Sequence, residues 1–295
     1  MALSEFLAKL GDEVVHVDEE TFDLFSQTAA LPNLGMIDAK AETLEITIGA
    51  KDYTITQSPG LLQSSHEQGT TGAVVWQSSV RVAEWLADPR SSLFNAGLFD
   101  HDSTVLELGS GISGIVATVL AAQVKAVVAT DQQHVLRLLR SNIDANAGHR
   151  SDRKSHGGRK ASKVRQPSSS IQVIALDWEE DDVQRHLASN DLRQGVDVVI
   201  ACDCIFNYAL INPLVQTCED ICKLRSEAVT ESNLSAGSTV CLVAQQLRQS
   251  EVFEQWLKTF MRSFRVWRLP DNMLSGGLQE GSGFVVHVGV LREKR

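Results

Sequence analysis

A glycine-rich turn carries the strongest chemical signal in the chain. The run Glu107-Leu-Gly109-Ser-Gly111-Ile-Ser-Gly114 follows a short apolar stretch and precedes apolar residues at helical spacing. Between a strand and a helix, such glycines let a nucleotide-like cofactor approach the backbone and let the two elements pack closely. Asp131 ends the next apolar stretch, 17 residues after Gly114. Its carboxylate is therefore placed to accept hydrogen bonds from ribose hydroxyls.

Glu107, two residues before the first glycine, separates two classes of cofactor. A dinucleotide places its pyrophosphate at such a turn, where a carboxylate would repel it. S-adenosylmethionine has no phosphate, and a carboxylate attracts its ammonium and sulfonium groups. The turn therefore favours a methyl donor. A nicotinamide or flavin cofactor and an inert tight turn are the alternatives.

The elements around this turn predict an α/β fold. Apolar strand-like runs at 104–108, 126–130, 171–175, 196–201 and 239–244 alternate with amphipathic helical patterns. Strands that are apolar throughout indicate a parallel sheet covered on both faces. The last two runs, 264–269 and 284–291, have no helix between them and predict an antiparallel edge hairpin. We expect a Rossmann-like sheet of seven strands with helices on both faces.

Two segments fall outside this pattern. Residues 1–70 predict a small N-terminal α+β appendage with a β-hairpin across 44–55, and residues 71–295 form the main domain. A stretch at about 148–170 is rich in Ser, Gly, Lys and Arg. It lies where connections usually run about 2–6 residues, so we expect a disordered basic insertion.

Several motifs together resemble a known family. The glycine run, Asp131, Asp177-Trp178 and Asp203-Cys-Ile-Phe206 resemble the motif series of class I, seven-strand S-adenosylmethionine-dependent methyltransferases. Thr71-Gly-Ala-Val-Val-Trp76 narrows the resemblance to family 16, the methyltransferase-like protein-lysine methyltransferases, and to its fungal members that act on ribosomal proteins. The resemblance covers about residues 70–291, and the first 70 residues carry no sharp motif.

The resemblance implies a set of donor contacts. It assigns S-adenosylmethionine binding to Trp76, Gly109, Ser110, Gly111, Asp131, Trp178 and Cys202. The chemistry of the residues adds Glu107 and Asp177 to this set. Trp76 would cover the donor as an aromatic lid, or it belongs to the core. Asp177 would bond the adenine amine, or it caps the following helix. Cys202 would line the floor without thiol chemistry.

The same resemblance assigns the methyl acceptor to Asp203 and Phe206. Asp203 would orient an incoming amine and Phe206 would wall the channel for the aliphatic stem, unless Asp203 only caps the next helix. The nucleophile must be a neutral amine, which costs a free lysine roughly 4–5 kcal/mol at pH 7. We name no general base. An adenine or cytosine methyltransferase usually has Pro-Pro after this acid; here Cys-Ile follows, which favours a protein acceptor.

Charge is unevenly distributed along the chain. The net charge is −10, which argues against a protein that coats DNA. Residues 1–70 carry twelve acidic side chains and three lysines, a net charge of −9. They would dock a basic protein such as a ribosomal protein, or they only solvate the appendage. Residues 149–165 carry +6; they would contact rRNA weakly, or form a solvated loop.

The remaining features indicate an intracellular protein, cytoplasmic or nuclear. The five cysteines form neither a disulfide framework nor a convincing zinc pattern, so we expect no metal. No signal peptide is visible, and no apolar stretch approaches the roughly 20 residues that span a bilayer. The resemblance to the family implies a protein-lysine N-methyltransferase acting on a 60S ribosomal protein. The alternatives are a methyltransferase acting on another protein or a small molecule, and a non-catalytic donor-binding module.

Overall fold

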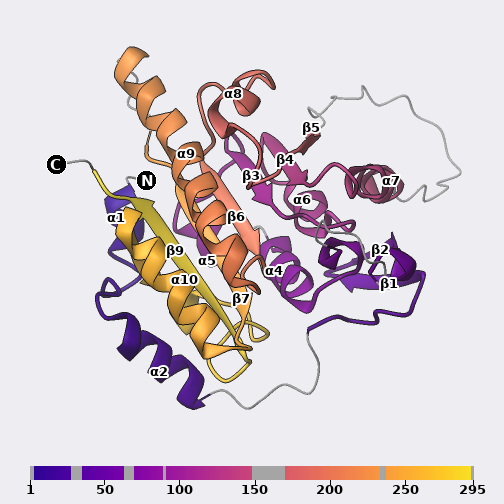
Figure 1. Ribbon diagram of the computed structural model, residues 1–295, viewed down its shortest axis with the longest axis horizontal. Coiled ribbons are helices and arrows are strands. Elements are labelled where there is room, and N and C mark those ends of the chain that lie inside the picture. Colours follow the sequence, from indigo (N-terminus) through magenta and orange to yellow (C-terminus); the bar gives the residue numbers. More distant parts are fainter. Residues whose placement is uncertain are drawn as a thin grey trace, which may run out of the picture.

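A seven-stranded sheet forms the centre of the molecule (Figure 1). The computed structural model describes residues 3–27, 35–62, 70–88, 91–147, 170–232 and 237–293. The strands lie in the order β5-β4-β3-β6-β7-β9-β8. Neighbours from β5 to β7 run parallel, whereas β9 is antiparallel to both β7 and β8. The predicted seven-strand α/β fold and its antiparallel edge are confirmed.

The elements have the following bounds. The strands are β1 (Thr43–Ile48), β2 (Lys51–Thr56), β3 (Thr104–Leu108), β4 (Ala126–Asp131), β5 (Ser170–Ala175), β6 (Val198–Cys202), β7 (Val240–Gln246), β8 (Phe264–Arg268) and β9 (Phe284–Leu291). The helices are α1 (Leu3–Leu7), α2 (Val17–Gln27), α3 (Pro59–Leu62), α4 (Gln77–Ala87), α5 (Ser92–Asn95), α6 (Ile115–Leu120), α7 (Leu136–Ala147), α8 (Val183–Ala188), α9 (Tyr208–Ser232) and α10 (Ser250–Ser263).

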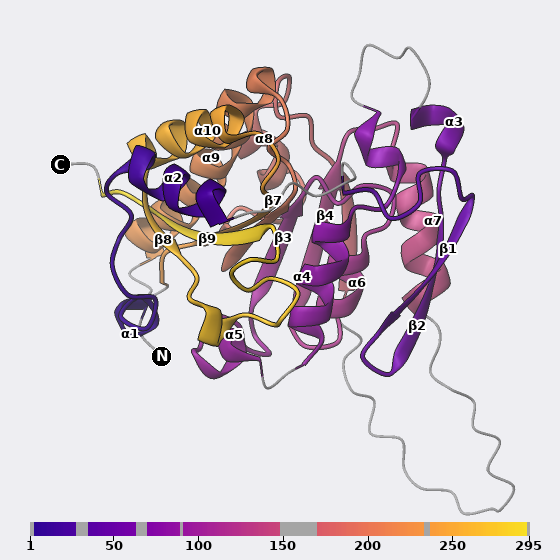
Figure 2. The same ribbon diagram turned by 90° about the horizontal axis from the view of Figure 1, so that it is seen from below.

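Two apolar clusters cover the two faces of the sheet. Helices α4, α6 and α7 contribute buried side chains to one cluster, and α8, α9 and α10 contribute to the other. The two groups of helices lie on opposite sides of the sheet (Figure 2). Every residue of β6 and β7 is buried, which explains why these strands read as continuous apolar runs. On α10 the apolar residues share one helix face, where Trp256 stacks on Phe260 at 5.4 Å between ring centroids.

The predicted hairpin, β1 and β2, is bound to α7 by two asparagine side chains. Asn142 accepts from the backbone N–H of Thr56 (2.9 Å) and donates to the carbonyl of the same residue (2.9 Å). Asn146 does the same with Thr54, at 3.0 and 2.9 Å. These amides satisfy backbone groups on the outer edge of β2 as a neighbouring strand would.

Helix α2 is bound to the other end of the chain by a buried pair. Glu20 Oε1 lies 2.9 Å from His287 Nε2 on β9, with Glu20 9 % exposed and His287 fully buried. Burial raises the pKa of Glu20, but the hydrogen bond and charge of His287, together with Arg268, outweigh burial and lower it. The first and last parts of the chain therefore meet at this pair.

The predicted basic insertion and the predicted domain boundary at residue 70 both stay predictions. The basic insertion expected at about 148–170 lies outside the described residues, except for Ser170 at the start of β5. Its weak contact with rRNA stays a prediction. The division of the chain at residue 70 also stays a prediction.

Candidate functional site

A cavity of about 580 Å³ opens at the carboxyl ends of β3, β4 and β6. Ligands of open α/β sheets bind at this edge. The cavity brings together ten of the residues predicted from sequence: Trp76, Gly109, Ser110, Gly111, Asp131, Asp177, Trp178, Cys202, Asp203 and Phe206. Gly72, Gln132, Cys204 and Arg248 also line it and were not predicted as site residues.

The glycine turn forms one wall of the cavity. Gly109 and Gly111 have φ angles of 64° and 59°, the left-handed region that favours glycine. A Cβ on Gly109 would lie 2.8 Å from Cys204 Sγ and 3.4 Å from the Trp178 ring. A Cβ on Gly111 would lie 3.3 Å from the carbonyl oxygen of Gly72. Only glycine therefore keeps this wall open at both positions.

Asp131 fixes the turn from the end of β4. Its Oδ2 accepts from the backbone N–H of Gly111 and its Oδ1 from that of Gln132, both at 2.8 Å. Burial raises the pKa of this carboxyl, although the two backbone hydrogen bonds oppose the rise. Each carboxylate oxygen keeps a further lone pair, so a hydroxyl group in the cavity still finds an acceptor.

Glu107 lies behind the turn and does not line the cavity. Its side chain is 2 % exposed, and Oε2 accepts from the backbone N–H of Ala117 on α6 (3.2 Å). Burial raises its pKa to about 7, although Ser110 and the Ala117 hydrogen bond oppose the rise. Contact of this carboxyl with a methyl donor stays a prediction.

Asp177 and Trp178 form the part of the cavity wall next to the glycine turn. Asp177 accepts from Gln132 Nε2 and from the backbone N–H of Glu179, both at 3.0 Å. The helix that follows, α8, is capped by Asp182, so the alternative that Asp177 caps it is wrong. Trp178 Nε1 is buried and has no hydrogen-bond partner among the described residues. A ligand acceptor in the cavity would satisfy it.

Asp203 and Arg248 form an ion pair in the wall of the cavity. Arg248 Nη1 donates to Asp203 Oδ1 at 2.7 Å, and Nη2 donates to Oδ2. The guanidinium carbon lies 5.2 Å from the centroid of the Trp76 ring. Phe206 is 40 % exposed at the mouth. Asn207 Oδ1 accepts from the N–H of Ala209 in the first turn of α9, so Asp203 does not cap this helix.

Cys202 and Cys204 complete the floor of the cavity as buried thiols. Cys204 Sγ donates to the carbonyl of Leu108 at 3.3 Å. Burial raises the pKa of both thiols well above their ordinary value, and the charges of Glu107 and Asp203 add to this rise; for Cys204, Asp131 adds to it as well. Both side chains therefore stay protonated and act as small apolar groups at neutral pH.

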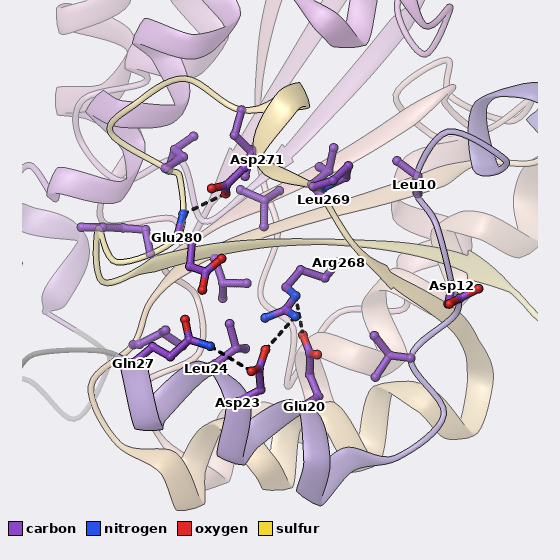
Figure 3. Close-up of a pocket in the computed structure, with 18 of the residues that line it drawn as sticks. Leu10, Asp12, Glu20, Asp23, Leu24, Gln27, Arg268, Leu269, Asp271 and Glu280 are labelled. Carbon is purple, nitrogen blue, oxygen red and sulfur yellow. Dashed lines mark hydrogen bonds and ion pairs between the residues drawn. The ribbon is translucent and has the colours of Figure 1, made fainter.

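A second cavity of about 630 Å³ lies between α2, the segment before it and the β8–β9 edge (Figure 3). Its acidic side chains are Asp12, Glu13, Glu19, Glu20, Asp23, Asp271 and Glu280. Arg268 reaches Asp23 at 2.8 Å, and Gln27 donates to the same carboxylate at 2.9 Å (Figure 3). No predicted site residue lines this cavity.

Within the described ranges, no group of three or more His, Cys, Asp or Glu side chains is arranged to hold a metal ion. Among the same residues, no helix combines the length and apolar character needed to cross a membrane.

Comparison with known proteins gives consistent matches. A family model described as "Lysine methyltransferase" matches residues 56–251. Ribosomal lysine N-methyltransferase 5 of Zygosaccharomyces rouxii is 30 % identical over 242 residues, 74 % of this chain and 72 % of that protein. A Schizosaccharomyces pombe protein named diaminohydroxyphosphoribosylamino-pyrimidine deaminase is 34 % identical over 260 residues, 88 % of this chain. The chain spans about half, 54 %, of that longer relative.

Among solved structures, the chain resembles a SAM-dependent methyltransferase from Agrobacterium tumefaciens. The TM-score is 0.43 at 14 % sequence identity, and the match covers 92 % of this chain and 80 % of that one.

Proposed function

Because the chain belongs to the lysine methyltransferase family, we propose that it is an S-adenosylmethionine-dependent protein-lysine N-methyltransferase whose acceptor is a lysine of a 60S ribosomal protein. One observation carries the proposal. The residues matched by the family, 56–251, contain both the glycine turn and the Asp203–Phe206 motif, and these line one cavity at the carboxyl edge of the sheet.

The cavity residues fit the methyl donor. When bound, S-adenosylmethionine supplies an electrophilic methyl group on its sulfonium. Gly109 and Gly111 leave backbone exposed where a side chain would fill the cavity. Asp131 offers carboxylate lone pairs to the ribose hydroxyls, and Trp178 offers an aromatic face and a buried N–H without a partner. These residues hold the donor in the proposal, with Asp177 beside the adenine.

The acceptor end of the cavity suits an amine on an aliphatic stem. Val74, Leu210 and Phe206 give it apolar walls, and Trp76 covers one side. An apolar environment disfavours an ammonium and so lowers the pKa of the lysine, which favours loss of its proton to water. The main contribution of the protein is then alignment of the amine with the methyl group.

The acceptor protein is proposed from two observations. Relatives such as that of Z. rouxii are named for methylation of a ribosomal lysine. Ribosomal proteins are basic, and residues 1–70 carry a net charge of −9, with α2 and its neighbours placing several carboxylates around one cavity. Opposite charges speed association, so these acids would steer a basic partner. Such a partner places the enzyme in the cytoplasm or the nucleus.

The test combines donor binding with transfer. Purified protein is incubated with tritiated S-adenosylmethionine and a ribosomal-protein fraction, and the labelled band is identified by mass spectrometry. We expect label on a lysine of one large-subunit protein. Label on nucleic acid or small molecules alone would contradict the proposal. Donor binding in calorimetry without transfer to any acceptor would support a non-catalytic donor-binding module instead.

A further inference from the structure

The Asp203 carboxylate, which lines the cavity, is paired with Arg248. Two parallel hydrogen bonds join it to the guanidinium of Arg248, with Nη1 to Oδ1 at 2.7 Å and Nη2 to Oδ2. The Asp203 side chain is 3 % exposed, and that of Arg248 is 18 % exposed. A bidentate arginine–carboxylate pair fixes both groups in direction as well as distance. A free anion is therefore absent at this position.

The backbone around Asp203 is held in an unusual conformation. Its φ angle is 60°, the left-handed region that few residues other than glycine adopt. Its N–H donates to the carbonyl of Ala244 on β7 at 2.8 Å, and its Oδ1 also lies 3.4 Å from the N–H of Gln246. Strained residues persist where surrounding contacts over-determine them, and such residues concentrate at functional sites.

Arg248 connects Asp203 to Trp76, the residue before α4. Its guanidinium lies over the ring of Trp76, the residue that precedes α4, and Nη2 also donates to Gln246 Oε1 at 3.1 Å. Trp76 is fixed in turn, because its Nε1 donates to the carbonyl of Thr71 at 2.9 Å. Backbone at Gly35 packs against the same group, where a Cβ would lie 2.8 Å from Arg248 Nη2.

We propose that Arg248 is a positioning residue for the methyl acceptor: it holds Asp203 and Trp76 in place and neutralises the Asp203 carboxylate, so that the amine enters uncharged. This inference rests on the proposed function. An unpaired carboxylate at this point would bind the acceptor as its ammonium, which has no lone pair for the methyl group. Paired with Arg248, Asp203 orients a neutral amine without stabilising its protonated form.

The cavity wall and the residues behind it contain other titratable groups, which stay in place when Asp203 or Arg248 is substituted. They are Asp131, Asp177, Glu179, Glu180, Cys202, Cys204 and Glu107. A shift of the pH profile on altering Arg248 that disappears when Asp203 is also changed to Asn is therefore assigned to the Asp203 carboxylate.

The test compares Arg248→Gln with the double variant Asp203→Asn/Arg248→Gln. In Arg248→Gln the freed carboxylate should move the pH profile of kcat to higher pH by about one unit, so kcat near neutral pH falls about tenfold. The double variant carries no anion there, and its profile should return to that of the wild type. Arg248→Lys keeps the charge without the bidentate fork and should lie between the two.

Arg225→Gln is the matched control. Arg225 is also 18 % exposed and pairs with Asp197 at 2.5 Å, but this pair lies before β6 and outside the cavity. We expect a lower melting temperature and an unchanged pH profile. If Arg248→Gln behaves like this control, with an unshifted profile, the inference is wrong. If the wild type binds the donor but labels no protein, the proposed function fails instead. Should Arg248→Gln not fold, the profile of Arg248→Lys decides.

Discussion

The two ends of strand β6 carry the same chemistry in different surroundings. Asp197 precedes the strand and pairs with Arg225 of α9; Asp203 follows it and pairs with Arg248. At the amino end, Asp197 Oδ2 also accepts from the N–H of Thr104 at 2.7 Å, so it joins β6 to β3. At the carboxyl end, the pair lies in a cavity wall on a strained backbone. Position relative to the sheet, and not residue type, separates a pair that joins two strands from a pair that lines the cavity.

The largest expected effect tests whether a residue at the carboxyl edge of the sheet also contributes to the stability of the protein. Glu107, near the carboxyl end of β3, has a pKa raised by burial from 4.5 to about 7. Between pH 4.5 and 7 the Glu107 carboxyl is ionised in the unfolded chain but still protonated in the folded protein. The free energy of unfolding therefore falls as the pH rises through this range. Glu107→Gln should remove this fall, worth about 3 kcal/mol between pH 4.5 and 7. Urea unfolding of both proteins across this range measures it. Parallel stability curves would contradict the buried carboxyl.

The next effect compares two glycines, Gly109 after the carboxyl end of β3 and Gly195 before the amino end of β6. Gly109 and Gly195 have φ angles of 64° and 68°, and a Cβ on either would lie 2.8 Å from a neighbour. Gly109→Ala should weaken donor binding about 100-fold, because the turn moves into the cavity. Gly195→Ala, against the backbone of Arg225, should cost about 1–3 kcal/mol of stability and leave donor affinity within twofold. Calorimetry and thermal unfolding distinguish them. Equal losses of donor affinity in the two variants would contradict the assignment of donor binding to the turn at Gly109.

A smaller difference is expected between the two aspartates. Asp203→Ala should lower kcat roughly 10–100-fold while donor affinity stays within about threefold, since the glycine turn is untouched. Asp197→Ala should lower stability by about 1–2 kcal/mol through loss of its hydrogen bonds, with kcat unchanged. Steady-state kinetics and urea unfolding on both variants give the answer. Unchanged transfer by Asp203→Ala would remove this residue from the mechanism.

The smallest effect concerns the second cavity, between α2 and the β8–β9 edge, whose lining is rich in acidic side chains and which we call the acidic cavity. Asp23 and Arg268 form an ion pair in which the two side chains are 44 % and 39 % exposed. Asp23→Asn should change stability by less than about 0.5 kcal/mol, because solvent screens such pairs. If the acidic cavity steers a basic partner, the KM for the protein acceptor should rise about twofold at low salt. A peptide around the methylated lysine serves as control. A KM that rises equally for peptide and protein would argue against docking there.

The sheet and the glycine turn could be predicted because their signals are local. Continuous apolar runs define β3, β6 and β7, and a strand–glycine–helix pattern defines the turn. Arg248 was missed because its partner lies 45 residues away and meets it only where β6 and β7 pair. The position of Glu107 behind the turn depends on which face of β3 meets α6, and the sequence motif does not specify that face.

The Glu20–His287 pair has a consequence for the order in which the chain can be completed. The two residues lie 267 positions apart. Ribosomes deliver a chain from its amino end at about 5–20 residues per second. Helix α2 therefore emerges many seconds before β9, the strand that buries its carboxylate. Until β9 emerges, helix α2 and its apolar residues lack the native surface that covers them, and in this interval a nascent-chain chaperone would be needed.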